Sequence, residues 1–274
     1  MITKNDNGVV LAQTSAQLLD GAPIRELILL AGKDGVGKSS AIVSLAWYVE
    51  QMNPAAKFYV IDTENKFKSA LRSFGADAPG NVLYYKTSNM NEVTTALGGI
   101  MDKHKSGDWL AVESMGPIWD QAQDLAYQAI VGVSKAEFLE KKGRGKGPIP
   151  QPDDFWKIAK GAYDGAFLDV IRGCEDMNII LTSIAKPIKA DGGFIKESKD
   201  RKAFRIEVGM DANLSGSPTM PSIVETLCML ELNQGAVTCR VLRDNLSTVD
   251  PSRVEFEVPS RRDWAVTFWA NCRS

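Results

Sequence analysis

Residues 32–39 read Gly-Lys-Asp-Gly-Val-Gly-Lys-Ser, a complete match to the phosphate-loop pattern G-x-x-x-x-G-K-[ST]. The glycines allow consecutive backbone N–H groups to surround a phosphate without interference from Cβ atoms. Lys38 brings a positive charge to the β- and γ-phosphates, and the Ser39 hydroxyl is a ligand for Mg²⁺. We therefore expect a nucleoside triphosphate to bind Gly32, Lys33, Asp34, Gly35, Val36, Gly37, Lys38, Ser39 and Ser40.

The flanking sequence supplies the strand and the helix that this motif requires. Residues 27–31 form a short apolar run, which is typical of a strand buried in a parallel sheet. In residues 40–52, apolar side chains recur at helical spacing. The helix would present its N-terminus to the bound anion.

Composition favours one large α/β domain. The chain has 274 residues, with 32 Lys and Arg against 34 Asp and Glu, so any affinity for nucleic acid must be local. No apolar run reaches transmembrane length, and residues 1–7 are polar. We expect a cytoplasmic protein without a membrane partner.

The thiols show no metal-ligand spacing. Cys174, Cys228, Cys239 and Cys272 are scattered, and the single histidine, His104, lies in a Lys/Asp-rich helix end. Structural thiols are therefore expected rather than a zinc site or a disulfide framework.

Apolar strands alternate with helical stretches, as in a parallel sheet with covered faces. The predicted strands are residues 27–31, 57–61, 82–85, 109–112, 179–183, 226–232, 236–242 and 254–258. Asn233-Gln234-Gly235 predicts a hairpin between the sixth and seventh of these. The expected organisation is an N-terminal arm (1–21) and one domain (22–274), with basic loop insertions near 133–152 and 187–217.

Acidic side chains follow two of the strands. Glu64 is the candidate base that positions the attacking water, although Asp62 and Glu64 could instead cap the next helix. The run Trp-Leu-Ala-Val-Glu-Ser at residues 109–114 looks like a Walker B element, so Glu113 is expected to join Ser39 at Mg²⁺. Asp is usual at that position, and Asp108 or Asp62 remain alternatives.

Together these motifs resemble the RecA-type ATPase core shared by RecA, RadA and KaiC. The resemblance is carried by the phosphate loop, Ile-Asp-Thr-Glu (61–64), Glu113-Ser114 and Leu-Thr-Ser (181–183). A predicted helix over residues 154–175 is similar to one in phage-encoded RecA paralogues that accompany single-strand annealing proteins. The resemblance implies a RecA-like P-loop core, mostly parallel, with a C-terminal β-hairpin, and an ATPase that uses ATP and Mg²⁺.

The resemblance also implies a role in recombination, replication or repair. It predicts a homo-oligomer, ring or filament, that binds single-stranded DNA, with a single-strand annealing or single-strand binding protein as a further partner. If the protein is phage-encoded, its place is the host cytoplasm. The expected DNA-binding residues fall in two basic segments: Lys141, Lys142, Arg144, Lys146, Lys189, Lys196, Lys199, Arg201 and Lys202.

RecA-type assemblies complete their ATP site with a cation from a neighbouring subunit. Arg243, at the end of the predicted hairpin, is the candidate for this trans-acting catalytic role, with Arg240 as the alternative. A subunit without such a neighbour should hydrolyse ATP slowly.

Two other classes remain open. Lys33 resembles the signature lysine of ParA- and MinD-like dimeric ATPases, although Asp34 replaces a glycine of their pattern. Glu113 in place of Asp also leaves room for a nucleotide-gated assembly protein with little turnover.

Overall fold

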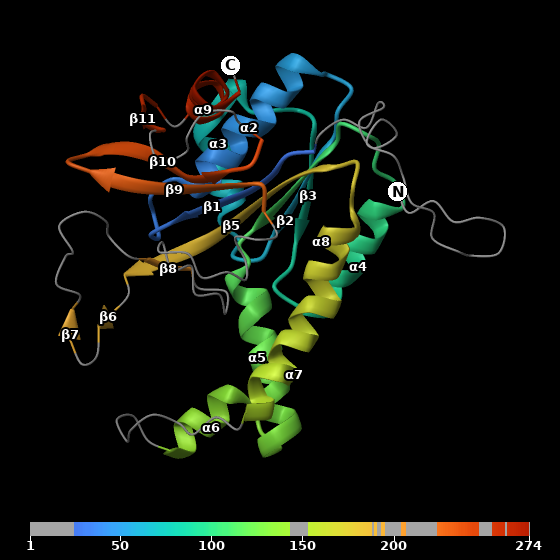
Figure 1. Ribbon diagram of the computed structural model, residues 1–274. Coiled ribbons are helices and arrows are strands. Elements are labelled where there is room, and N and C mark those ends of the chain that lie inside the picture. Colours follow the sequence, from blue (N-terminus) through green and yellow to red (C-terminus); the bar gives the residue numbers. More distant parts are fainter. Residues whose placement is uncertain are drawn as a thin grey trace, which may run out of the picture.

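The computed structural model describes residues 25–142, 153–187, 189–190, 193–194, 204–206, 224–246, 254–260 and 262–273. The strands of the main path are β1 (Leu27–Gly32), β2 (Phe58–Asp62), β3 (Val82–Lys86), β4 (Trp109–Glu113), β5 (Asn178–Pro187), β9 (Thr226–Asn233), β10 (Ala236–Asp244) and β11 (Glu255–Val258). The helices are α2 (Lys38–Met52), α3 (Phe67–Phe74), α4 (Met90–Met101), α5 (Gly116–Val131), α6 (Lys135–Lys142), α7 (Asp153–Tyr163), α8 (Asp169–Gly173) and α9 (Trp264–Cys272) (Figure 1).

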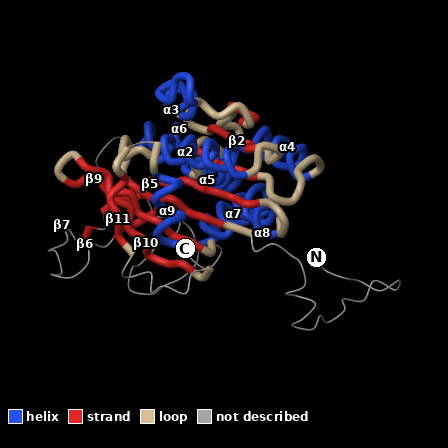
Figure 2. Tube along the Cα trace, turned by 90° about the horizontal axis from the view of Figure 1, so that it is seen from above, coloured by secondary structure: helices blue, strands red, loops and turns tan. Residues whose placement is uncertain are grey.

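The central sheet has the order β11-β10-β9-β1-β5-β4-β2-β3. Neighbours from β3 to β9 pair in parallel, whereas β10 is antiparallel to both β9 and β11. Seen from above, β9, β10 and β11 gather at one end of the sheet and β2 lies toward the other (Figure 2). The expected fold class is confirmed: a RecA-like P-loop core with a mostly parallel sheet, flanking helices and a C-terminal β-hairpin.

Strand periodicity divides the core between two faces. Leu27 and Leu29 pack with α4, α5, α7 and α8, whereas Ile28 and Leu30 pack with α2, α3 and α9. Because successive side chains of a strand point to opposite faces, a continuous apolar run is what a sheet covered on both sides requires. The arrangement brings the ends of β1, β2 and β4 to one edge of the sheet, where the phosphate loop begins.

Helices α5 and α7 run side by side beyond the sheet, with α6 at their far end (Figure 1). Aromatic contacts hold them together, including Tyr127 with Phe155 at a centroid distance of 4.9 Å and Tyr127 with Phe138 at 5.3 Å. Part of the predicted loop 133–152 is therefore helix α6. The predicted helix 154–175 is observed as α7 and α8, joined by a π-helical turn, η2 (Asp164–Leu168).

Three short strands lie in the predicted loop 187–217. They are β6 (Lys189–Ala190), β7 (Gly193–Phe194) and β8 (Phe204–Ile206); β6 pairs with β7, and β8 pairs with the end of β5. Each of these strands has only two or three residues, which is too short for an apolar alternation to identify it in the sequence.

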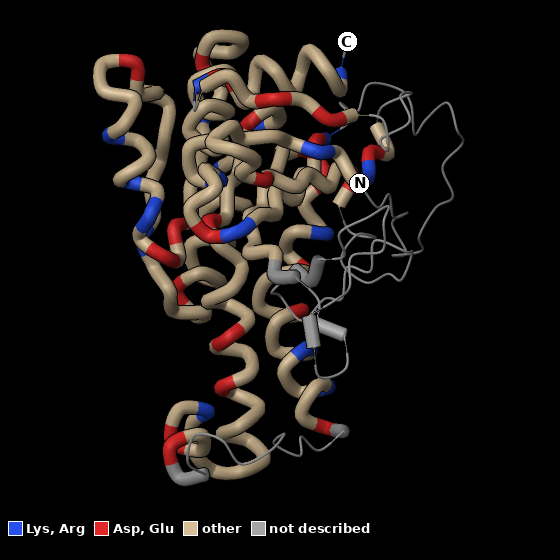
Figure 3. The backbone as a smooth tube through the Cα atoms, turned by 90° about the vertical axis from the view of Figure 1, so that its left-hand side faces the viewer, with Lys and Arg blue, Asp and Glu red and all other residues tan. Residues whose placement is uncertain are grey.

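Basic and acidic positions are interspersed along the described backbone (Figure 3). Among the helices of the described residues, none combines the length and the apolar character needed to cross a bilayer.

Candidate nucleotide site

The phosphate loop needs glycine at three positions for two different reasons. A Cβ on Gly32 would lie 2.7 Å from the Leu230 carbonyl oxygen and 2.8 Å from Val36 Cγ1. Gly35 and Gly37 have φ angles of 77° and 105°, in the region that side chains disfavour. Close packing against β9 thus fixes the start of the loop, and backbone conformation fixes its turn.

Lys38 lies folded against the loop that it terminates. Its Nζ donates to the carbonyl oxygens of Gly32 and Lys33, both at 2.9 Å. Burial lowers the pKa of Lys38, while the nearby carboxylates of Glu113, Asp34 and Glu64 oppose that shift. Among the described residues, the hydrogen bonds of this buried ammonium go to neutral carbonyl oxygens, so a phosphate oxygen that carries full charge would be a stronger partner.

Ser39 and Glu113 meet at the edge of the sheet. The Ser39 hydroxyl donates to Glu113 Oε1 at 2.5 Å, and Glu113 Oε2 is buried without a hydrogen-bond partner among the described residues. Burial raises the pKa of Glu113 to about 7, with further contributions from Asp62 and Glu64. An unpartnered carboxylate oxygen beside a hydroxyl fits the oxygen ligands that Mg²⁺ takes. The peptide bond that follows Glu113 is cis.

Asp62 has a structural role. Its Oδ1 accepts from the backbone N–H groups of Glu64 and Lys66 at 3.2 Å, and its Oδ2 accepts from Phe67 N–H and from the Tyr84 hydroxyl, both at 3.0 Å. Between two of these residues, Asn65 adopts a φ of 60°. Asp62 is thus the carboxylate that caps α3. The Glu64 side chain does not take part in this cap and is available for another role.

Glu64 lies between the phosphate loop and the end of β4. Its Oε1 accepts from the Ser114 hydroxyl at 3.3 Å, and its Oε2 pairs with Lys66 Nζ at 2.8 Å. Thr63 ties this turn to β4, because its hydroxyl donates to the Ser114 carbonyl oxygen at 2.6 Å. The predicted base therefore stands beside the predicted Mg²⁺ ligand.

A charged cavity of about 670 Å³ brings these groups together. It is lined by Asp34, Gly35, Gly37, Lys38, Ser39, Ser40, Glu64, Asn65, Lys66, Ser69, Ala70, Ser73 and Glu113. Sequence reasoning missed Lys66 and the α3 residues in this set, because only the turn after β2 brings them to the loop.

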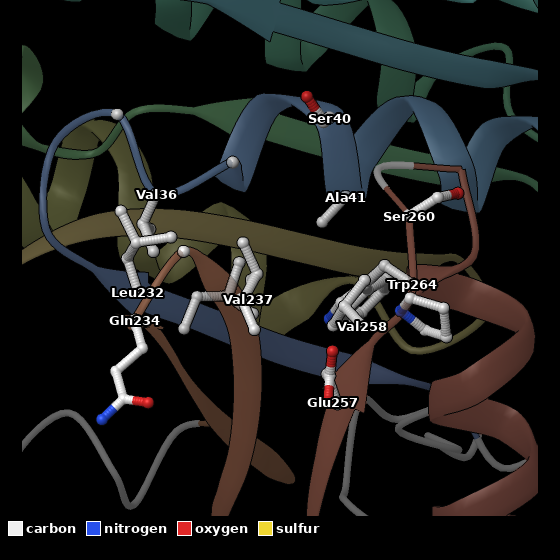
Figure 4. A pocket seen from close by; sticks show the side chains of 16 residues that line it. Val36, Ser40, Ala41, Leu232, Gln234, Val237, Glu257, Val258, Ser260 and Trp264 are labelled. Carbon is white, nitrogen blue, oxygen red and sulfur yellow. The ribbon is translucent and has the colours of Figure 1, made fainter.

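A second cavity, of about 540 Å³, adjoins the first and shares Gly35, Gly37 and Ser40 with it. Figure 4 shows Val36, Leu232 and Val237 on one side and Val258 and Trp264 on the other, with Ala41 of α2 near them. Trp264 is buried, and its Nε1 has no hydrogen-bond partner among the described residues. We call this the apolar cavity after these side chains, although Gln234, Glu257 and Ser260 also line it, and such a lining suits a flat ring that carries a few polar groups.

The sequence could not signal the apolar cavity. Val36, the hairpin and Trp264 are separated by up to about two hundred residues of chain, and the antiparallel strands β10 and β11 bring them together. The aromatic near the loop comes from a C-terminal helix, α9, outside any nucleotide motif.

The structure places the predicted trans-acting arginine away from its own phosphate loop. Arg243 pairs with Leu227 and donates through Nε to Asn245 Oδ1 at 3.2 Å. Arg240 pairs with Met229, closer to the loop, and forms an ion pair with Glu231 at 3.2 Å. Neither arginine lines the charged cavity, so a catalytic role for either requires a neighbouring subunit.

Most of the predicted DNA-binding residues lie outside the described residues: Arg144, Lys146, Lys196, Lys199, Arg201 and Lys202. The backbones of Lys141 and Lys142 lie in α6, and that of Lys189 lies in β6. Helix α6 stands at the far end of the projecting helices, distant from the phosphate loop (Figure 1).

His104, Cys174 and Asp176 come close together near the starts of β4 and β5. His104 Nε2 lies 2.7 Å from Asp176 Oδ1, and Nδ1 lies 2.9 Å from the Met101 carbonyl oxygen. Both ring nitrogens therefore have protein partners, which agrees with a structural role for this group.

The chain matches no protein-family model and no curated protein sequence. Solved structures that are similar to the chain include the following two. A KaiC-like protein from Pyrococcus horikoshii OT3 aligns at 10% identity and a TM-score of 0.45, over 88% of this chain and 89% of its own. The flagellar accessory protein FlaH from Methanocaldococcus jannaschii aligns at 14% identity and a TM-score of 0.42, over 85% and 87%. At these TM-scores the fold assignment rests on the sheet topology of this chain.

Proposed function

We propose that the protein binds Mg²⁺ and ATP in the two adjoining cavities, hydrolyses the ATP, and couples this to binding of single-stranded DNA as an oligomer. One observation carries the nucleotide part. Lys38, Ser39, Glu64 and Glu113, from three separate segments, converge on one cavity at the phosphate loop. Ligands of open α/β sheets bind at this carboxyl edge of the strands.

Each residue has a stated role in hydrolysis. A water oxygen forms a bond to the γ-phosphorus while the bond to the β,γ-bridging oxygen breaks, which gives ADP and inorganic phosphate. Glu64 orients the water and accepts its proton. Lys38 and the loop N–H groups bind the phosphates. Ser39 and Glu113 would hold Mg²⁺, which supplies positive charge to the β- and γ-phosphates.

The apolar cavity supports a nucleoside next to the triphosphate. Because it shares Gly35, Gly37 and Ser40 with the charged cavity, one molecule can extend across both. We assign the base to the apolar cavity, with Trp264 and Val258 on one side of it. Adenine is favoured over guanine because the sequence has no Asn-Lys-x-Asp guanine-reading motif.

The DNA and oligomer parts rest on the RecA-type resemblance. The proposed DNA contacts are the basic segments around 141–147 and 187–205, and the proposed cross-subunit cation is Arg243. These groups neutralise phosphates without reading bases, so binding should not depend on DNA sequence.

A second candidate function is a nucleotide-gated assembly protein with little turnover. The ion pair between Glu64 and Lys66 favours it, because a base held by a cation is a weak proton acceptor. A ParA-like dimeric ATPase is a separate alternative, which rests on Lys33, exposed at the start of the loop.

The deciding experiment is the ATPase rate with and without single-stranded DNA at several protein concentrations. Stimulation that rises with protein concentration would support a shared site in an oligomer. An ATPase rate that single-stranded DNA does not change would favour the nucleotide-gated assembly protein. Lys38→Ala serves as the reference variant: we expect ATP affinity to fall by more than about a hundredfold, since a buried charge-assisted contact to phosphate is lost.

A further inference from the structure

Lys66 is the second cation of the charged cavity. Of the described residues that line this cavity, only Lys38 and Lys66 are basic. Lys66 Nζ lies 2.8 Å from Asp34 Oδ1 in the phosphate loop and 2.8 Å from Glu64 Oε2. One ammonium group thus bridges the loop and the predicted base.

The backbone of Lys66 is held in place, whereas its side chain is partly exposed to solvent. Asp62 accepts from the Lys66 N–H, and Asn65, just before it, adopts a left-handed conformation that Asn tolerates better than most residues. The Lys66 side chain is 43% exposed and that of Asp34 is 69% exposed, so solvent screens their pairing. A lysine on such an anchor can exchange partners by rotating its four-carbon stem.

A bound triphosphate would offer the Lys66 ammonium a more strongly charged partner than Asp34 or Glu64. Its γ-phosphate carries more charge than a carboxylate, and it would enter a space already occupied by the carboxylates of Asp34, Glu64 and Glu113. Without a cation at this point, Glu64 and the γ-phosphate would repel each other. The hydrogen bonds that Lys66 donates to Asp34 and Glu64 raise its pKa, and the phosphate that would replace them is also an anion, so the ammonium keeps its charge during the exchange.

We propose that Lys66 is a catalytic cation supplied in cis: it pairs with Asp34 and Glu64 in the nucleotide-free protein and moves to the γ-phosphate of bound ATP. The move releases Glu64 Oε2 to accept the proton of the attacking water, and Lys66 stabilises the charge that develops on the transferred phosphoryl group. The inference rests on the proposed ATPase function and deepens it. It implies that each subunit hydrolyses ATP slowly by itself and distinguishes ATP from ADP without a neighbour.

The test compares Lys66→Met with Lys68→Met, a lysine two positions further along α3 that is exposed and does not line the cavity. Equilibrium binding of ADP and of the slowly hydrolysed analogue ATPγS is measured at a protein concentration low enough to prevent assembly. We expect Lys66→Met to weaken ATPγS about tenfold, to leave ADP within about twofold, and to slow single-turnover hydrolysis at least tenfold. Lys68→Met should match the wild type in all three, and Lys66→Arg should restore part of the preference for ATPγS.

The possible results distinguish failure of the proposed Lys66 role from failure of the proposed ATPase function. If Lys66→Met weakens ADP and ATPγS equally, or changes neither, Lys66 does not contact the γ-phosphate and the inference is wrong. If the wild-type protein binds neither nucleotide, the proposed function itself fails. Melting temperatures of all variants show whether a loss reflects unfolding; the exposed position of Lys66 predicts that they stay unchanged.

Discussion

The carboxylates at the edge of the central sheet where the parallel strands end differ in hydrogen bonding from those at the edge where the strands begin. At the edge where the parallel strands end, Glu113 Oε2 is buried with no hydrogen-bond partner in the part of the chain that the structure describes, and two cavities adjoin the phosphate loop. At the edge where they begin, carboxylates are satisfied: Asp108 accepts from the backbone N–H groups of Lys57 at 2.8 Å and Lys105 at 2.9 Å. Of the carboxylates compared, the one with unmet hydrogen-bonding capacity thus lies at the edge that can bind a ligand.

A buried ion network shows the contrast most clearly. Arg273 joins Glu26, just before β1, to Asp244, at the end of β10, with N–O distances of 2.7 Å and 2.5 Å. Burial lowers the pKa of Arg273, but its hydrogen bonds to Glu26 and Asp244 outweigh that effect and raise it. This cation serves the fold, whereas Lys38 and Lys66 at the other edge have partners that a phosphate can replace.

The largest effect that would sharpen this comparison is on turnover. Glu64→Gln should lower the ATPase rate about 10²- to 10³-fold because the amide cannot accept the proton of water. ATP affinity, measured by titration, should stay within about threefold. Glu140→Gln, exposed in α6, is the matched control and should have no effect. Normal turnover in Glu64→Gln would show that another group is the base.

Breaking the network at the opposite edge should affect stability and leave binding intact. Arg273→Met leaves Glu26 and Asp244 partly buried without their cation, so the free energy of unfolding in urea should fall by about 3 kcal/mol. The exposed pair of Arg172 with Asp169 provides the control, and Arg172→Met should cost less than about 0.5 kcal/mol. A large loss of ATP affinity in folded Arg273→Met would contradict the division of roles between the edges.

A substitution in the apolar cavity should weaken binding of ligands that carry a base and leave binding of the phosphates alone unchanged. Val237→Trp would fill it, and excluding a base from about 60 Å² of apolar contact costs about 1.5 kcal/mol. That corresponds to an ATP affinity about tenfold weaker. Inorganic tripolyphosphate, which has no base, should bind as to the wild type. Equal weakening of both ligands would place the base elsewhere.

The smallest expected effect is a pH dependence at the edge where the strands begin. Burial lowers the pKa of His104, but the hydrogen bond and charge of Asp176 outweigh it, so the pKa lies above its ordinary value. The pair therefore stabilises the fold below about pH 6.5, and this contribution is lost as the pH rises through the raised pKa. Between pH 6 and pH 8.5 this pair should account for a fall in stability of about 0.5 kcal/mol, measured as the difference between the wild type and Asp176→Asn, because the raised pKa of Glu113, about 7, makes that group titrate in the same range in both proteins. Identical profiles for the two proteins would show that the His104–Asp176 pair does not contribute.

Local patterns predicted much of the fold. The predicted strands correspond to the observed strands of the main sheet path to within a few residues. Most of them could be recognised because a buried strand has a short apolar sequence between turns. The hairpin turn was equally local: Gln234 and Gly235 adopt the positive φ angles of 50° and 92° that a two-residue turn requires. Helix α6 and the short strands β6, β7 and β8 were not predicted. The sequence of α6 is strongly polar, and each of the three strands has only two or three residues, too few to show a strand period.

The candidate site divides in the same way. Each phosphate-loop residue follows from a contiguous motif. Asp62 could be separated from Glu64 only when the structure showed which carboxylate caps α3. The predicted roles of Glu64, Glu113 and Arg243, and the predicted DNA contacts, stay predictions that the proposed experiments test.

The sequence by itself determined the phosphate loop, the strands that carry it and the acidic residues that follow them, because each is specified by neighbours within a few positions. Only the tertiary structure decided that Lys66 faces Glu64 and the loop, that Trp264 closes an apolar cavity beside them, and that Arg273 seals the opposite edge. No regular spacing in the sequence relates the residues that make these contacts. The order of the strands in the sheet and the turns between them bring these residues together.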